Sequence, residues 1–275
     1  MEREKVLLAQ EKETLLITLY GRAVDNHQTH PILADKTSED VIHRIDYDFR
    51  KLKTTAGDRF AVVLRAKQLD RWIAAFLANN PDAIVLHLGC GLDTRIFRID
   101  PPASVDWYDL DYPEVVALRK RLYPERAGYR MIASSVTDQG WLEQVPAGGL
   151  ALIIAEGLTM YLSECEVRSL LERITNHFSG GEIAFDALSS VAVGLAQHHK
   201  SIKATGASIT WGVDDPHEIE SWNHRLKFVD ESSIVGSPDV AMLPWAYRIL
   251  CGGLNHFASF RSRSRLLRYS FSDHN

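Results

Sequence analysis

Two glycines and an acid occur at the spacing of a nucleoside-binding turn. Gly89 and Gly91 stand one residue apart, directly after the apolar run 84–86, which predicts a buried parallel strand. Neither glycine has a Cβ, so the backbone can turn sharply there and approach a ligand closely. About twenty residues further on, a second short strand over 105–108 leads to Asp109 and Asp111. An acid at the end of that strand is placed to accept hydrogen bonds from both hydroxyls of a ribose.

The residues after the turn indicate which nucleoside is bound. A dinucleotide fingerprint needs a third glycine three residues after the second, where the helix packs closely against the strand. Thr94 occupies that position, and the loop carries Asp93 and is followed by Arg95 and Arg98. S-adenosylmethionine has no pyrophosphate, so a shorter glycine turn is sufficient for it.

Each of these residues also has a purely structural interpretation. The glycine pair could be a tight turn between a strand and a helix. Asp111 could be the N-cap of a helix that starts with Pro113 in its first turn and Glu114 at its third position. The two roles of Asp111 can coexist, because a side chain at the end of a strand can cap a helix and still face a ligand.

The elements that must position these residues form an α/β pattern. Short apolar strands alternate with helices between residues 81 and 190, which predicts a parallel sheet. The strands are expected at 83–88, 105–108, 130–133, 150–155 and 182–186. A helix is expected after Ser163, which forms a capping box with Glu166, and Gly180 and Gly181 are expected to end it.

The flanking segments have different patterns. Residues 1–80 are predicted to be helical, with the last helix stopping at Asn79, Asn80 and Pro81. Residues 189–238 are rich in Gly, Ser, His and Asp and are predicted to form an insertion with loops. The tail around 264–271 is predicted to be a last edge strand. We therefore expect a helical cover over 1–80, a binding core over 81–190, and a lid or substrate insertion with closing edge strands over 191–275, all within one structural domain.

Composition excludes several classes of protein. The 275 residues carry a formal net charge of −5, whereas a general nucleic-acid binder would show a basic face. The three cysteines, Cys90, Cys165 and Cys251, lack metal-ligand spacing, so no metal site or disulfide framework is expected. The charged N-terminus is unlike a signal peptide, and no stretch approaches the ~18 apolar residues of a membrane span. We expect a cytoplasmic protein that binds neither nucleic acid nor membrane.

Several motifs together resemble one family. Residues 88–95 read Leu-Gly-Cys-Gly-Leu-Asp-Thr-Arg, residues 111–113 read Asp-Tyr-Pro, and residues 155–162 read Ala-Glu-Gly-Leu-Thr-Met-Tyr-Leu. These segments resemble signatures of the leucine carboxyl methyltransferase family. Residues 14–23 are similar to the opening helix of its bacterial branch, the tetracenomycin-type polyketide O-methyltransferases. The resemblance covers most of residues 10–190, and it implies a class I, Rossmann-like methyltransferase with a mostly parallel seven-stranded sheet, helices on both faces, and S-adenosylmethionine as cofactor.

The resemblance also implies a set of cofactor-binding residues. They are Arg22, Arg65, Gly89, Gly91, Asp111, Ser135, Val136 and Glu156. Arg65 would pair with the carboxylate of S-adenosylmethionine, as a guanidinium can hold it with two parallel hydrogen bonds, and Arg22 would be a second cation at that end. Asp111 would bind the ribose, Glu156 would accept from the ammonium, and Ser135 with the Val136 amide would contact the adenine.

Two departures from the family pattern bear on the acceptor. After the third strand the family often has an acid near the adenine and an arginine two residues later, where this chain has Ser135 and Thr137. In the phosphatase-methylating branch that arginine helps to bind the acceptor carboxylate, and Thr137 supplies no charge. His87 stands where the family often has an asparagine, and we interpret it as a structural hydrogen-bonding residue.

Methyl transfer from a sulfonium mainly needs alignment and exclusion of water. A carboxylate acceptor is ionised at neutral pH, whereas a phenol or alcohol needs a base. Tyr161 follows the fourth strand, so we expect it beside the acceptor oxygen as the catalytic residue. No base stands out among the histidines of the loosely patterned region, which are His198, His199, His217 and His224. This favours a carboxylate.

Residues 210–216 could form a lid that carries acceptor specificity. Trp211 and Trp222 could stack on a planar substrate or be core aromatics. The leading hypothesis is an S-adenosylmethionine-dependent O-methyltransferase that acts on a carboxylate or hydroxyl of a small molecule, such as an aromatic polyketide, as a monomer or homodimer. The alternatives are an NAD(P)-dependent oxidoreductase and a non-catalytic S-adenosylmethionine-binding homologue.

Overall fold

A computed structural model describes residues 3–6, 14–52, 54–196 and 208–273. Strands lie at β1 (Glu4–Lys5), β2 (Ile45–Asp46), β3 (Ile84–Leu88), β4 (Asp106–Asp111), β5 (Tyr129–Ala133), β6 (Leu150–Ala155), β7 (Gly180–Leu188), β8 (Leu226–Ser233) and β9 (Ser264–Ser272). Helices lie at α1 (Thr14–Asp25), α2 (Lys36–Arg44), α3 (Ala56–Asn79), α4 (Arg95–Ile99), α5 (Pro113–Leu122), α6 (Glu164–His177), α7 (Ser190–Ala196), α9 (Glu218–Trp222), α10 (Trp245–Asn255) and α11 (Ala258–Arg261). Short 3-10 turns lie at η2 (Phe49–Leu52), η3 (Gly140–Gln144), η4 (Thr159–Tyr161) and η5 (Pro238–Met242).

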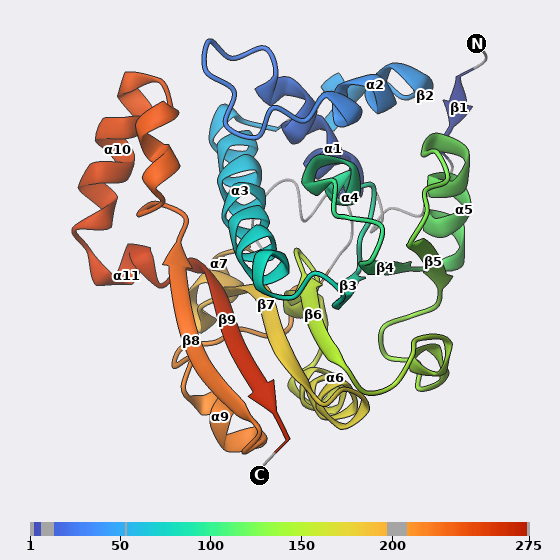
Figure 1. Ribbon diagram of the computed structural model, residues 1–275. Helices are drawn as coiled ribbons and strands as arrows, with labels where there is room; N and C mark the ends of the chain where they lie inside the picture. Colours follow the sequence, from blue (N-terminus) through green and yellow to red (C-terminus); the bar gives the residue numbers. More distant parts are fainter. Residues whose placement is uncertain (1–2, 7–13, 53, 197–207, 274–275) are drawn as a thin grey trace.

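The main sheet has seven strands in the order β5-β4-β3-β6-β7-β9-β8 (Figure 1). The strands from β5 to β7 pair in parallel, and β9 pairs antiparallel with both β7 and β8. This is the mostly parallel seven-stranded sheet that the family resemblance implies. The carboxyl ends of its parallel strands gather at one edge, which is where ligands bind in open α/β sheets.

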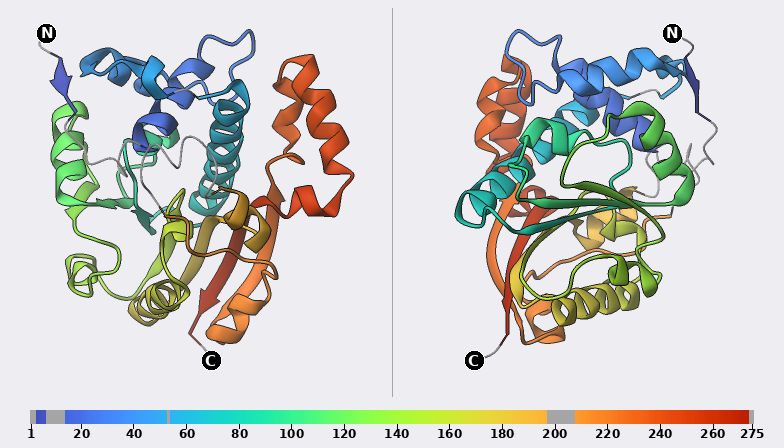
Figure 2. Two further views of the ribbon diagram at one scale, coloured as in Figure 1. Left: turned by 180° about the vertical axis from the view of Figure 1, so that it is seen from behind. Right: turned by 45° about the vertical axis from the view of Figure 1, so that its right-hand side comes forward.

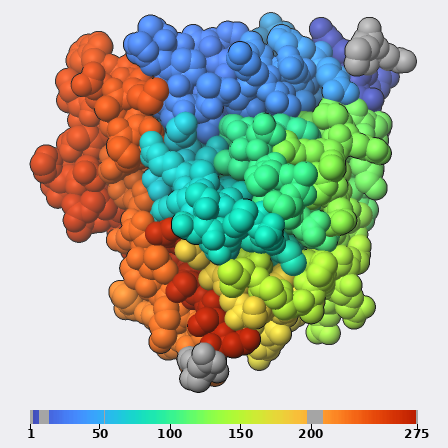
Figure 3. All heavy atoms as spheres, viewed as in Figure 1, coloured from blue at the N-terminus to red at the C-terminus, as the bar shows by residue number. Residues whose placement is uncertain are grey.

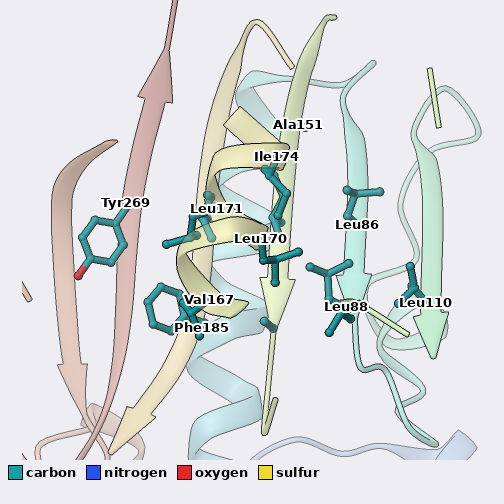
Figure 4. Packing of buried hydrophobic residues seen from close by; sticks show 14 of the residues in the cluster. Leu86, Leu88, Leu110, Ala151, Val167, Leu170, Leu171, Ile174, Phe185 and Tyr269 are labelled. Carbon is teal, nitrogen blue, oxygen red and sulfur yellow. The ribbon is translucent and has the colours of Figure 1, made fainter. Parts of the chain in front are cut away.

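Alternating side chains of the central strands fill two separate cores. Leu86 and Leu88 of β3 join the cluster that packs against α6, whereas Val85 joins the cluster under α3. Figure 4 shows Val167, Leu170, Leu171 and Ile174 of α6 against one face of the strands. Figure 2 shows α6 and α3 on separate sides of the sheet. Because both faces are covered, the strands read as continuous apolar runs rather than alternating ones.

The N-terminal helices cover the edge of the sheet that carries the strand ends. In Figure 3 the blue segment forms a cap across one end of the molecule, next to α3 in cyan. Helix α3 ends at Asn79, as predicted, and its N-terminus has a capping box formed by Thr55 and Asp58. At the other side, α10 and α11 stand away from the sheet and have no buried residues, so Trp245 and Ile249 are exposed.

The sequence-based prediction for α6 is correct at its start and wrong at its end. Ser163 and Glu166 form the capping box, but the helix is C-capped by Phe178, and Gly180 and Gly181 begin β7. Strand packing explains the glycines. A Cβ on Gly181 would lie 1.8 Å from the carbonyl oxygen of Ala151 on the neighbouring strand.

Three further predictions are corrected by the structure. Residues 264–272 form a strand, but β9 lies between β7 and β8 instead of at the sheet edge. The loosely patterned region contains a strand, β8, that sequence periodicity did not reveal. Tyr112, not Asp111, is the N-cap of α5. The two carboxylate oxygens of Asp111 accept hydrogen bonds from the N–H groups of Gly91 and Tyr112, neither of which belongs to the helix. Among the described residues, no helix has the length and apolar character needed to cross a membrane.

Candidate active site

A cavity of about 900 Å³ opens at the carboxyl ends of β3, β4, β6 and β7, beneath α1 and α3. Ligand pockets usually measure about 300–1,000 Å³, so this cavity lies near the upper end of that range. The structure brings every predicted site residue to its wall: Arg22, Arg65, Gly89, Gly91, Asp111, Ser135, Val136, Glu156 and Tyr161. Residues far apart in the sequence therefore share one site, although their individual roles remain predictions.

The glycine turn after β3 is shaped for close approach of a ligand. Gly89 and Gly91 have φ angles of +60° and +51°, a region that side chains with a Cβ rarely adopt. A Cβ on Gly91 would lie 3.2 Å from the Cβ of Leu15 on α1. The Gly91 N–H donates to Oδ2 of Asp111 at 2.7 Å, and the Tyr112 N–H donates to Oδ1 at 2.7 Å. The acid is thereby fixed beside the turn, and burial raises its pKa.

Arg65 of α3 is held between the ends of two neighbouring strands. Its Nε donates to Oε1 of Glu156 at 2.9 Å, and its Nη1 donates to Oδ2 of Asp186 at 2.6 Å. The Gly157 N–H donates to the other oxygen of Asp186 at 2.6 Å. Within the described residues Nη2 of Arg65 has no hydrogen-bond partner, so one edge of the guanidinium can still bind an anion.

Burial and the neighbouring charges set the protonation states of Arg65, Glu156 and Asp186. Burial alone would raise the pKa of Glu156, but the guanidinium groups of Arg65 and Arg95 lower it to about 2. Asp186 differs, because burial outweighs the effect of Arg65 and raises its pKa above the usual value. Burial acts against the charge of Arg65, but the two carboxylates keep its pKa above the usual range.

A buried ion network behind the cavity wall positions Glu156. Arg95, which is fully buried, donates through Nη2 to Oε2 of Glu156 and through Nε to Asp70 at 2.9 Å. Arg98 donates to the same Asp70 at 2.7 Å and to Asp35 at 2.9 Å. Asp35 also caps α2. Arg95 and Arg98 follow the glycine turn in the sequence, but no motif predicts this role for them. Asp35 and Asp70 lie in segments without a recognisable motif, so the sequence does not predict them as site residues.

Arg22 and His87 line the same cavity as the glycine turn. Arg22 is buried, with its Nη1 3.7 Å from Asp93 and its Nε without a hydrogen-bond partner among the described residues. The two ring nitrogens of His87 lie 3.2 Å from Oδ1 of Asp109 and 3.2 Å from Nη1 of Arg95. This agrees with a structural role for His87.

The loop after β5 forms the end of the cavity where the resemblance places the adenine. Ser135 and Val136 line the cavity there. Arg173 of α6 donates to the carbonyl oxygens of Val136 at 2.7 Å and Asp138 at 2.5 Å. An arginine from another element therefore holds this loop in place. The sequence does not predict this contact, because Arg173 lies on a helix far along the chain.

The opposite end is lined by η4, the end of β7, α7 and residues 208–210. Burial raises the pKa of Tyr161, so its hydroxyl stays protonated at neutral pH. Residues 210 and 211 are tied to η4, since Thr210 N–H donates to the Met160 carbonyl at 2.9 Å and Thr210 Oγ1 donates to the Leu162 carbonyl at 2.8 Å. Residues 210 and 211 are thus anchored beside the cavity, and a lid over 210–216 stays a prediction.

The two tryptophans considered for stacking are packing residues. Trp211 is buried in the core with Phe185, and Trp222 is half-buried beneath the guanidinium of Arg168 at 4.0 Å. His217 and His224 are not among the residues that line the cavity, and His198 and His199 lie outside the described residues. The described residues contain no cluster of His, Cys, Asp and Glu that could hold a metal ion.

The model of the leucine carboxyl methyltransferase family matches residues 16–175 of the chain. The chain belongs to this family. It is 44% identical over 268 residues to the tetracenomycin polyketide synthesis O-methyltransferase TcmP of Streptomyces glaucescens, with 98% of this chain and 99% of the relative covered. It is 38% identical over 249 residues to the S-adenosyl-L-methionine-dependent methyltransferase dpfgK of Gibberella zeae, with 83% and 84% covered.

Solved structures share the fold at low sequence identity. A candidate methyltransferase of Thermobifida fusca YX superposes with a TM-score of 0.61 at 16% identity, covering 92% of this chain and 94% of its own. Together the family and its relatives show that this family member is an S-adenosylmethionine-dependent O-methyltransferase. The alternatives of an oxidoreductase and of a non-catalytic homologue receive no support from them.

Proposed function

We propose that this methyltransferase esterifies a carboxylate of a small aromatic, polyketide-like acceptor. This proposal rests on the polar side chains around the cavity, which are already bound to other protein groups and so are poorly placed to act as a general base. Glu156 is bound by two arginines, Asp111 by two backbone N–H groups, and His87 lies between Asp109 and Arg95. A carboxylate needs no base, because it is already ionised at neutral pH. The relative whose name refers to polyketide synthesis supports an acceptor of that class.

The cavity fits S-adenosylmethionine by the chemistry of its donors and acceptors. Asp111 would bind the ribose, the Gly89–Gly91 turn leaves space that a Cβ would fill, and the free edge of Arg65 would bind the carboxylate. Glu156 would accept from the ammonium, and Ser135 and Val136 would contact the adenine. Arg22 would add a second positive charge near the methionine end. S-adenosylmethionine supplies an electrophilic methyl group on a sulfonium.

The chain's own residues would orient the acceptor and exclude water. Leu158, Met160, Leu188 and Ile209 give the acceptor end an apolar wall, which suits a planar aromatic molecule. Tyr161, kept protonated by burial, would donate its hydroxyl to the acceptor oxygen that is not methylated. In this proposal residues 1–80 cover the cofactor, 81–190 bind it, and 191–275 complete the acceptor side.

One observation favours a hydroxyl acceptor as the second candidate. Burial raises the pKa of Asp186, which would make it a better base than an ordinary aspartate. Its two oxygens already accept from Gly157 N–H and Arg65, however, so a proton could be taken only by weakening one of these bonds.

A matched pair of acceptors separates the two candidates. We would incubate the purified protein with methyl-labelled S-adenosylmethionine and either 2-naphthoate or 2-naphthol, and then treat the products with mild alkali. A methyl ester releases labelled methanol, whereas a methyl ether does not. The proposal expects label from the acid that alkali releases, and an alkali-stable product from the naphthol alone would contradict it. Calorimetric titration with S-adenosylhomocysteine, with NAD as the control, first confirms that the protein is competent to bind cofactor.

A further inference from the structure

Arg263 lines the cavity at its acceptor end, and no acidic side chain among the described residues forms an ion pair with it. The other arginines of the wall are paired: Arg65 with two carboxylates, and Arg22 with Asp93. Within the described residues the Arg263 guanidinium has no ion pair, and its Nε is buried without a hydrogen-bond partner. This Nε has almost no exposed surface, so a ligand cannot reach it. The charge of the guanidinium, which no carboxylate of the described residues neutralises, is what would attract an anion to this part of the cavity wall.

The local structure holds the guanidinium in a fixed position. Arg263 follows α11 directly before β9, and its carbonyl oxygen accepts from Ser189 N–H at 3.2 Å. Its Cζ lies 4.0 Å from the centre of the Phe260 ring, a stacking geometry that fixes the plane of the guanidinium. Little conformational freedom of the side chain is then lost when an anion binds. The planar guanidinium can donate two parallel hydrogen bonds to a carboxylate.

Strand register gives the separation between Arg263 and the methionine end of the site. In the β7–β9 pair, Asp186 lies opposite Leu266 and Leu188 opposite Ser264, so Arg263 lies beside residue 189. Residue 189 directly follows β7 and is three positions beyond Asp186, which binds Arg65. At about 3.3 Å per residue this is roughly 10 Å along the strand. Apolar side chains of α7, Ala192 and Leu195, line the cavity near this position.

We propose that Arg263 binds a second anionic group of the acceptor, at the end of the molecule remote from the oxygen that is methylated. The inference rests on the proposed function, since it assumes that an aromatic acid occupies this end of the cavity. It narrows the substrate class to elongated aromatic molecules with an acidic group at each end. The apolar wall has Arg65, paired with Glu156 and Asp186, at one end and Arg263 at the other. Two fused aromatic rings with carboxylates at opposite ends match this arrangement.

The test compares two probes that differ only in the second acid. Naphthalene-2,6-dicarboxylate and 2-naphthoate would be titrated calorimetrically into the protein saturated with S-adenosylhomocysteine. A charge-assisted hydrogen bond corresponds to about a tenfold to hundredfold difference in affinity. We expect the wild type to prefer the dicarboxylate by that factor, and Arg263→Gln to bind both probes alike. Arg263→Lys, which keeps the charge but not the fork, should retain part of the preference.

Controls keep the outcome specific to Arg263. Arg261→Gln removes an exposed arginine of the same segment, which donates to the Asn255 carbonyl and does not line the cavity, so the preference should stay. Equal affinity of the wild type for the two probes, including no measurable binding of either, overturns the inference. So does a preference that survives in Arg263→Gln, or a parallel loss of S-adenosylhomocysteine affinity, which would assign Arg263 to the cofactor.

Methyl transfer to the same probes distinguishes this inference from the function on which it rests. Ester formation from both acids at equal affinity would keep the carboxyl methylation and remove the role of Arg263. A clear preference for the dicarboxylate without any ester would keep the Arg263 site and refute the carboxyl methylation.

Discussion

The Nε atom of Arg65 lies 2.9 Å from Oε1 of Glu156, so an ion pair joins the helix that precedes the sheet to the end of its central strand. The second oxygen of the same carboxylate accepts from Arg95 behind the wall. Glu156 is therefore held from both sides before any ligand binds. A carboxylate fixed in this way needs little reorganisation to accept a hydrogen bond from a cationic amine.

The ribose role of Asp111 predicts a loss of cofactor affinity. Asp111→Asn removes the charge but keeps the shape, so the affinity for S-adenosylhomocysteine should fall about tenfold to hundredfold, measured by calorimetry. Asp106→Asn, at the exposed start of the same strand and paired with Arg130, is the control and should bind normally. Unchanged affinity in Asp111→Asn would remove this residue from the cofactor site.

Tyr161 offers a test of the acceptor end. If its hydroxyl donates to the acceptor, Tyr161→Phe should lower kcat about tenfold and leave the affinity for S-adenosylhomocysteine unchanged. Single-turnover rates with 2-naphthoate, beside calorimetry with the cofactor product, measure both quantities. A rate equal to that of the wild type would show that Tyr161 only packs against the site.

Glu156 should make the stability of the protein depend on acid. Its pKa is lowered from the usual 4.5 to about 2 in the folded protein, so the carboxylate stabilises the fold above pH 4.5 and loses this contribution as the pH falls towards 2. The contribution is about 3 kcal/mol. Chemical unfolding of the wild type and of Glu156→Gln between pH 6 and 2 should show a difference that shrinks with acidification.

Asp186 contributes to the pH dependence of stability with the opposite sign to Glu156. Asp186 has a raised pKa, so its ionised form destabilises the fold and protonation relieves this as the pH falls. The charge of Glu156 also contributes to the raised pKa of Asp186, so Glu156→Gln reports the combined effect on both groups. Glu143→Gln, at an exposed glutamate of η3, should parallel the wild type. A stability difference that stays constant with pH would contradict the assignment of the lowered pKa.

The glycine turn should not tolerate a Cβ. Gly91→Ala places a side chain at φ +51° and 3.2 Å from the Cβ of Leu15, so we expect a loss of about 1–2 kcal/mol in the free energy of unfolding. Cofactor affinity should fall as well, because the turn moves. A Cβ on Gly253 of α10 would meet no atom of the described residues within 4 Å, so Gly253→Ala should be neutral or stabilising. Equal stability of both variants would show that the turn is less constrained than its backbone suggests.

Local patterns predicted those parts of the molecule that local interactions determine. The strand over 150–155 has its expected bounds, the capping box of Ser163 and Glu166 is formed, and the glycine turn lies beside Asp111. Each depends on residues close in sequence, or on a spacing that the βαβ unit enforces.

The remainder depends on contacts that the sequence does not display. In the sequence Asp186 is only the last residue of a predicted strand. Its ion pair with Arg65 forms because α3 crosses the sheet at that point. Gly181 looked like the end of a helix because its reason, the closeness of Ala151, comes from the neighbouring strand. Arg263 had no motif at all, since it reaches the cavity through the pairing of β9 with β7.

The position of β9 between β7 and β8 also determines an order of assembly. β8 precedes β9 in the chain, yet within the described residues it pairs with the main sheet only through β9. As the chain leaves the ribosome, residues 226–233 must wait until residues 264–272 have been synthesised and inserted. Chains stalled before residue 264 would expose the free edge of β7, which is a template for pairing with other chains. The pairing of β9 with β7 thus covers this free edge at the same time as it brings Arg263 to the acceptor end of the cavity.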